Sequence, residues 1–155
     1  MTRNLDSKDR QILRVLQKEG RISNQKLAEA VNLSPTPCLR RLRLLEKSGV
    51  IRGFSADIDA KLYGLTLLAF ISIKLESHTK SCVENFEKRI QSMNEVQACY
   101  LLTGAQDYLL HVLVADLEGY NSFVREKLHT IGGIASIDSS ISYDVVKCAS
   151  AFPEV

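Results

Sequence analysis

The first fifty residues alternate between apolar and polar positions with the period of an α-helix, in three short blocks. In the first block Ile12, Leu13 and Leu16 recur at helical spacing and share one side of a helix. Asp6 precedes the block as an N-cap candidate, because its carboxylate can accept a hydrogen bond from the unpaired N–H groups of a first turn. Gly20 follows at a position where helices commonly end. The pattern therefore predicts a first helix between Asp6 and Gly20.

The second block is shorter and predicts a helix that starts after Ser23. Leu27, Ala28 and Val31 fall on one face of this segment. Ser23 is the cap candidate at its start. Asn32 tolerates the left-handed conformation, so we expect the helix to stop there.

The third block reads "SPTPCLRRLRLLEKSG" and begins with two prolines. Ser34 is the cap candidate and Pro35 then takes the first helical position. A proline is tolerated there because the first four N–H groups of a helix have no intrahelical partner. Pro37 lies in the same turn, and Gly49 closes the segment. The prolines therefore predict where the third helix begins.

This third helix has two unlike faces. At about 100° per residue, one side gathers Cys38, Leu42 and Leu45, and the other carries Thr36, Arg40, Arg43 and Lys47. Two short helices, the turn "NLS" and a third helix with a basic outer face are typical of a helix-turn-helix motif. The second helix of such a motif reads base edges in the major groove, where arginine can bond guanine or a phosphate. A solvated basic helix in a plain three-helix bundle is the alternative that the spacing leaves open.

Residues 50–58, "VIRGFSADI", change to a strand-like alternation. We expect a short strand there, which acts as a small wing or as the start of a connecting hinge. The segment "DAKLYG" at 59–64 is then a linker.

From Leu65 onward the apolar period shortens to two in four segments, with two helical segments between them. We expect strands at 65–75, 95–104, 108–115 and 134–147, and helices at about 80–92 and 117–130. This β-α-β-β-α-β order is that of the ferredoxin-like fold. We expect both helices to cover one face of a four-stranded antiparallel sheet.

The strand at 108–115 is apolar on both faces, "YLLHVLVA". A single layer of helices covers one face of a sheet, so the other face is expected to meet a second subunit. A homodimer also suits two DNA-reading helices related by a two-fold axis.

The chain is thus expected to be α+β, with a winged-helix-like three-helix domain followed by a ferredoxin-like βαββαβ domain. The expected limits are 1–50 for the helix-turn-helix domain, 51–64 for the hinge strand and linker, and 65–155 for the second domain. Charge divides in the same way: residues 1–55 hold twelve Lys or Arg and five Asp or Glu, giving +7, and the remainder holds eight and thirteen, giving −5. A basic first third predicts a polyanionic partner such as double-stranded DNA.

The whole chain resembles the Lrp/AsnC family of bacterial and archaeal transcription regulators. The segments "LDSKDRQIL", "GRISNQKLAEAVNLSPTPCLRRLRLLEKSGVI" and "GAQDYLL" carry the resemblance. It implies a sequence-specific DNA-binding regulator of amino-acid metabolism or transport genes, without enzymatic activity or cofactor. It further implies dimers that assemble to an octamer, as a tetramer of dimers, and an amino-acid effector bound between C-terminal domains.

Carried onto this sequence, the resemblance places the DNA contacts at Ser34, Thr36, Arg40, Arg41 and Arg43. It places the effector between the turn after the second strand and the last strand, at Leu101, Thr103, Gly104, Asp107, Leu117, Ser140, Ile141 and Ser142. A glycine turn exposes backbone groups and Asp107 would supply charge for an ammonium group, although both residue types also suit a plain hairpin turn. "GAQD" lacks the aromatic residue often found before this aspartate, and Ser140 and Ser142 are more polar than in leucine-responsive members. A polar or differently sized effector therefore stays open.

Two alternatives come from other classes of function. A small ferredoxin-like enzyme would draw on His78, His111 or His129, but these are scattered, and no nucleophile–base pair or phosphate loop is present. A redox sensor would act through Cys38, Cys82, Cys99 or Cys148. No CxxC or HxxxH spacing occurs, so we expect reduced packing residues and no metal.

The remaining sequence features concern location. The longest apolar run, "LTLLAFISI", is too short to span a bilayer, and the N-terminus has no secretory signal. We expect a cytoplasmic, nucleoid-associated protein without a membrane partner.

Overall fold

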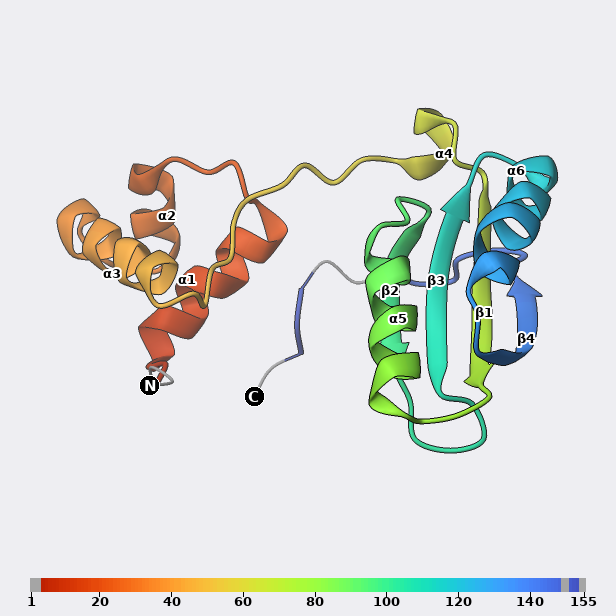
Figure 1. Ribbon diagram of the computed structural model, residues 1–155. Helices are drawn as coiled ribbons and strands as arrows, with labels where there is room; N and C mark the ends of the chain where they lie inside the picture. The colour runs from red at the N-terminus through yellow and green to blue at the C-terminus, as the bar shows by residue number, and fades with distance from the viewer. Residues whose placement is uncertain (1–3, 149–150, 154–155) are drawn as a thin grey trace. The chain divides into compact units, whose positions relative to one another are not determined.

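The computed structural model describes residues 4–148 and 151–153. These residues divide into two compact units: one holds residues 4–57 together with residues 146–148 and 151–153, and the other holds Ile58–Val145. The boundary falls inside the linker expected at 51–64, whereas the C-terminal stretch, expected in the second domain, groups with the first. Figure 1 shows the helices and strands of both units.

The first unit packs three helices on a small apolar core. They are α1 (Ser7–Lys18), α2 (Asn24–Ala30) and α3 (Pro35–Lys47). The predicted caps are confirmed, because the Asp6 carboxylate accepts from the Asp9 N–H at 2.8 Å and the Ser23 hydroxyl accepts from the Lys26 N–H at 3.3 Å. Asn32 has a φ of 52° and ends α2 as expected. The core consists of Ile12, Leu27, Ala28, Val31, Cys38 and Leu45.

The third helix has the two faces that its sequence predicts. Pro35 is its first residue, so the prolines mark its start, and Gly49 follows its end with a φ of 74°. Cys38 and Leu45 are fully buried, while Arg40 and Arg43 are exposed. The buried face fixes the helix in the unit and turns the cationic face outward.

The strand expected at 50–58 is wrong, because the structure assigns no strand there. A strand needs a partner for its N–H and C=O groups, and residues 52–58 form no backbone hydrogen bond with another described residue. The expected linker at 59–64 is partly helical. Its helix α4 (Ala60–Tyr63) is capped by the Asp59 carboxylate, which accepts from the Leu62 N–H at 2.9 Å.

The second unit is a four-stranded antiparallel sheet with the order β2-β3-β1-β4. The strands are β1 (Leu67–Leu75), β2 (Val96–Leu101), β3 (Tyr108–Val114) and β4 (Ile134–Ile141). Central β1 pairs with both neighbours, so that Ile71 lies opposite Leu110 and Ser139. Helix α5 (Lys80–Gln91) follows β1 and α6 (Leu117–Ser122) follows β3. The α+β class and the βαββαβ order are therefore confirmed.

The second helical segment and the last strand differ from expectation in detail. After α6 the chain continues as a π-helical turn over Phe123–Lys127 and a 3₁₀ turn over Leu128–Thr130. This change of pitch keeps Phe123 and Leu128 buried. Strand β4 ends before the expected residue 147, because its pairing with β1 runs out where the Ser142 N–H donates to the Leu68 C=O at 2.8 Å.

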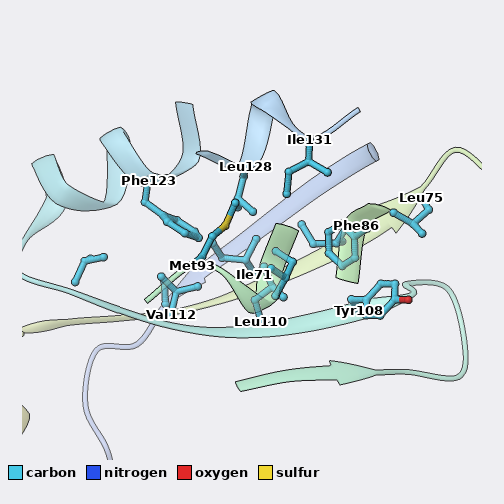
Figure 2. Packing of buried hydrophobic residues seen from close by; sticks show 14 residues of the cluster. Ile71, Leu75, Phe86, Met93, Tyr108, Leu110, Val112, Phe123, Leu128 and Ile131 are labelled. Carbon is cyan, nitrogen blue, oxygen red and sulfur yellow. The ribbon is translucent and has the colours of Figure 1, made fainter. Parts of the chain in front are cut away.

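Both helical segments lie on the same face of the sheet (Figure 1). Figure 2 shows the core between the two layers, where Leu110 and Val112 of β3 lie among Phe86, Phe123 and other apolar side chains. The opposite side of β3 carries half-buried Leu109, His111 and Leu113. The strand is thus apolar on both faces, as predicted, and no helix of this unit covers the outer one.

Candidate DNA-reading helix and effector region

The start of α3 leaves the Ser34 hydroxyl without the usual capping bond. A cap side chain accepts from the N–H of the second or third helical residue, and the third residue here is Pro37, which has no N–H. Ser34 has the backbone conformation of a cap, with φ −73° and ψ 153°, but makes no side-chain cap hydrogen bond. Ser34 and Thr36 are both exposed. Their hydroxyls lie at a helix N-terminus, which favours negative charge, and so are placed to meet a phosphate.

The cationic face of α3 is open to solvent. Arg40, Arg43 and Lys47 are exposed and form no ion pair with any residue that the structure describes. Three of the expected DNA contacts, Thr36, Arg40 and Arg43, therefore share one exposed face of α3, and the fourth, Ser34, is exposed at its N-cap.

Arg41, the fifth expected contact, has partners inside the protein. Its Nη1 lies 2.6 Å from Asp6 Oδ2 and 2.8 Å from Asp9 Oδ1. The Asp9 side chain is 2 % exposed and that of Arg41 is 27 % exposed. Hydrogen bonds to Asp6 and Asp9 raise the pKa of Arg41, while bonds from the Asp9 N–H and from Arg41 lower the pKa of Asp6. This contact joins α3 to the start of α1.

The turn after β2 is shaped by Gly104 and Asp107. Gly104 has a φ of 125°, a conformation that favours glycine. The Asp107 carboxylate is already engaged: Oδ2 accepts from the Leu75 N–H at 2.7 Å, and Oδ1 lies 2.8 Å from His78 Nε2. The hydrogen bond from His78, followed by that from Leu75, lowers the pKa of Asp107. The Asp107 carboxylate, which was expected to face an effector, thus holds the turn against the end of β1.

The expected effector residues form two separate groups on the sheet and its connecting segments. Leu101 pairs with Tyr108 at the start of β3, whereas Leu117 follows its end. One group is Leu101, Thr103, Gly104 and Asp107; the other is Leu117, Ser140, Ile141 and Ser142. The length of β3, about 20 Å at 3.4 Å per residue, separates Leu101 from Leu117. Ser140 and Ile141 lie nearer, because β1 places them in the rows of His111 and Val112 near the middle of β3. Within one chain Leu101 and Leu117 therefore do not line one small site.

Gln106 and Asp138 form a polar pair that sequence reasoning missed. The Gln106 amide donates to Asp138 Oδ2 at 3.3 Å and thereby connects the turn to β4. Gln106 Oε1 is buried and has no hydrogen-bond partner in the described part of the chain. Buried acceptors are normally paired, so a donor from a neighbouring subunit or a ligand would complete this one. Gln106 stands directly before Asp107, where the family often has an aromatic residue. This difference was the only sign in the sequence that position 106 has a different role here.

Aromatic and apolar side chains gather on the outer face of the sheet. His111 stacks on Phe70 with ring centroids 5.5 Å apart. In the next row of the sheet Tyr100 lies opposite Leu109. Phe70 is 39 % exposed and Tyr100 is 54 % exposed within one chain. This surface, with Leu68 and Leu113, is called the open face below.

The cysteines do not form a common site. Burial raises the pKa of the fully buried Cys38 thiol, which keeps it protonated and unreactive. Across residues 4–148 and 151–153, no group of three or more His, Cys, Asp or Glu could hold a metal ion. No helix in these ranges has the length and apolar content to cross a membrane.

Comparison with known proteins decides the family. Residues 5–52 match the winged helix-turn-helix DNA-binding model, and residues 68–152, more than half of the chain, match the Lrp/AsnC ligand binding domain. The chain belongs to the Lrp/AsnC family. Members of this family regulate transcription, so this Lrp/AsnC protein is a DNA-binding transcription regulator with a ligand-binding second domain, and it is not an enzyme.

Relatives of this Lrp/AsnC regulator match along almost its whole length. The leucine-responsive regulatory protein of Escherichia coli K12 is 39 % identical over 145 residues, which make up 94 % of this chain and 88 % of that protein. A transcriptional regulator of Neisseria meningitidis, solved in complex with L-Met, has a TM-score of 0.92 and 37 % identity over 97 % of each chain. An AsnC family regulator from Agrobacterium tumefaciens has a TM-score of 0.91 and 33 % identity, covering 96 % of this chain and 97 % of that one.

Proposed function

We propose that this regulator reads duplex DNA through the exposed face of α3, with Ser34, Thr36, Arg40 and Arg43 as contacts. The observation that carries the proposal is that Thr36, Arg40 and Arg43 share one solvent-facing stripe of the third helix, whose opposite stripe is buried, while Ser34 is exposed at the start of the helix. Hydroxyls at the helix start suit phosphate oxygens, and arginines farther along suit a phosphate or a guanine edge. Arg41 is left out, because two carboxylates already occupy its guanidinium.

The open face supports assembly with a second copy of the chain. Phe70, Leu109, His111 and Leu113 would leave water if two such faces packed together, as in a sandwich of two sheets. A two-fold axis through this contact would hold two α3 helices for successive grooves. Further association of dimers, up to an octamer, would follow the family pattern.

An amino acid is the proposed effector. Support comes from the match to the Lrp/AsnC ligand binding domain and from the L-Met bound by the Neisseria relative. The separation of Leu101 from Leu117 supports a site between subunits, one group coming from each. The free acceptor on Gln106 favours an effector with a donor group, which every amino acid has in its ammonium.

A site between subunits gives the effector a route to the DNA. A ligand shifts an equilibrium between two assemblies only by its difference in affinity for them. Binding between subunits would change how many α3 helices can hold DNA at once. The proposed targets are genes of amino-acid metabolism or transport, and the proposed location is the cytoplasm, at the nucleoid.

The effector proposal can be tested by a thermal-shift screen of the twenty amino acids, since a ligand that binds the native state raises the melting temperature. Leu101→Ala and Leu117→Ala should each remove the shift, although they lie at opposite ends of the sheet. Leu62→Ala is a matched control, because Leu62 is 88 % exposed on α4 and should keep the shift. A shift retained by both test variants would refute the assigned site.

Assemblies that contain both variants distinguish an effector site between two subunits from one within a single subunit. When Leu101→Ala and Leu117→Ala chains are unfolded, mixed and refolded together, some sites receive the natural leucine from both partners. Binding should then reappear at a fraction of the wild-type capacity. If the mixture binds no ligand while the wild-type protein treated in the same way does, the site does not take these residues from different subunits.

A further inference from the structure

The contact between Arg41 and two aspartates of the first helix has the features of a structural clamp. Asp9 is 1 % exposed, and a buried carboxylate requires a charged or hydrogen-bonding partner. Arg41 lies 2.8 Å from it and 2.6 Å from Asp6. The guanidinium therefore supplies a positive charge beside the buried Asp9 carboxylate.

Asp6 connects this clamp to the start of α1. Its carboxylate accepts a hydrogen bond from the Asp9 N–H at 2.8 Å through one oxygen and binds Arg41 through the other. The same group thus caps α1 and holds a side chain from the middle of α3. A movement of α3 away from α1 would therefore lengthen the contacts of Arg41 with both aspartates.

We propose that Arg41 is a positioning residue, which fixes the DNA-reading helix α3 against α1 and does not itself contact DNA. The proposal rests on the DNA contacts assigned to Arg40 and its neighbours above. Arg40 and Arg41 are adjacent in sequence, yet Arg40 is exposed without an ion pair among the described residues. Arg40 is therefore placed to bind DNA, whereas Arg41 holds α3 against α1.

Asp9→Asn gives a test in which the two roles predict opposite signs. If Arg41 contacted DNA, removal of the Asp9 charge would leave Asp6 as the carboxylate that binds the guanidinium, reduce repulsion of phosphates and tighten binding. If Arg41 positions α3, the same change should weaken binding to a mixed-sequence duplex at low salt by about tenfold, the loss of one well-placed contact. Glu46→Gln, which removes an exposed acid from α3, is the matched control and should leave binding equal or tighter. Tighter binding by Asp9→Asn would overturn the proposal.

The salt dependence of binding gives a second, independent readout. Arg40→Ala should reduce the slope of log affinity against log salt by roughly 0.9, the value for one phosphate contact. Arg41→Ala should lower affinity with an unchanged slope and should lower the melting temperature of the protein. If Arg41→Ala does not fold, Arg41→Gln also removes the positive charge but keeps a side-chain N–H donor, and it should show the same unchanged slope. If an Arg41 variant reduces the salt slope and leaves the melting curve unchanged, Arg41 contacts DNA and the proposal is wrong.

If Arg40→Ala leaves the slope unchanged, the assigned DNA contact is wrong. The sign of the Asp9→Asn effect still tests the clamp in that case, because it does not depend on Arg40.

Discussion

The His78 ring nitrogen Nε2 lies 2.8 Å from Asp107 Oδ1, while the other carboxylate oxygen accepts the Leu75 N–H at 2.7 Å. The aspartate of the effector turn is thus bonded to the end of β1 and to the segment that leads into α5. Its backbone N–H also donates to the Ile73 C=O at 2.9 Å. Asp107 therefore shapes the turn.

This contact predicts how stability depends on pH. The hydrogen bonds from His78 and Leu75 lower the pKa of Asp107 below its ordinary value of 3.8. The native state then binds fewer protons than the unfolded state, so the contribution of this group is complete above pH 3.8 and is lost as the pH falls through the lowered native pKa. Asp107→Asn should lower stability at neutral pH and flatten the acid limb of a urea-unfolding series.

Asp138→Asn provides the comparison for that series, since Asp138 lies in the same sheet and has a single amide contact, at 3.3 Å to Gln106. It should retain the wild-type acid limb. An equal flattening by both variants would show that the acid dependence does not arise at Asp107.

Ser34→Ala is predicted to weaken DNA binding with little effect on folding. An N-cap serine normally stabilises its helix by about 1 kcal/mol, but the Ser34 side chain makes no cap hydrogen bond. Its removal should therefore leave the urea midpoint nearly unchanged while affinity for duplex DNA decreases.

Ser23→Ala is the matched control, because the Ser23 hydroxyl accepts from the Lys26 N–H at 3.3 Å. This variant should lose about 1 kcal/mol of stability. Should Ser34→Ala destabilise the protein as much as Ser23→Ala, the hydroxyl of Ser34 caps α3 after all.

Local contacts explain why much of this fold could be predicted from its sequence. The caps at Asp6 and Ser23 bond to N–H groups three residues away, and Pro35 acts at its own position. The apolar period of β3 also predicts its buried and open faces without reference to distant residues. Such features can be predicted because they depend only on residues that are close together in the sequence.

The contacts that sequence reasoning missed join residues that are distant in the sequence. Arg41 meets Asp6 and Asp9 across separations of 35 and 32 residues, and a helical wheel gives only its side of the helix. Asp107 is likewise bonded to Leu75 across 32 residues. The strand expected at 50–58 has the alternation of a strand but no ladder within the described chain. Side-chain type and period indicate which secondary structure and which kinds of contact a segment can form. The tertiary fold decides which residues it contacts.

The open face predicts that a charge placed on it prevents self-association. Leu113→Asp should yield a monomer in sedimentation velocity, because an ionised carboxylate would have to be buried without a partner between two apolar faces. DNA affinity should decrease with it, since one α3 would bind where two did before. Leu62→Asp places the same charge on an 88 % exposed leucine of α4 and should keep the wild-type size. Dissociation of both variants, or of neither, would show that the open face is not the contact.

Gly133 is predicted to be the glycine of the second unit least tolerant of a side chain. Its φ is 88°, and a Cβ built there would lie 2.7 Å from the Cys82 sulfur. Gly133→Ala should therefore destabilise the protein by roughly 2 kcal/mol, from the left-handed conformation together with the overlap. Gly132→Ala is the control in thermal or urea unfolding, because no atom lies within 4 Å of its Cβ position. Adding Cys82→Ala to Gly133→Ala should recover only part of the loss, since it relieves the overlap and leaves the backbone strain. Full recovery would mean that the overlap alone makes glycine necessary at this position.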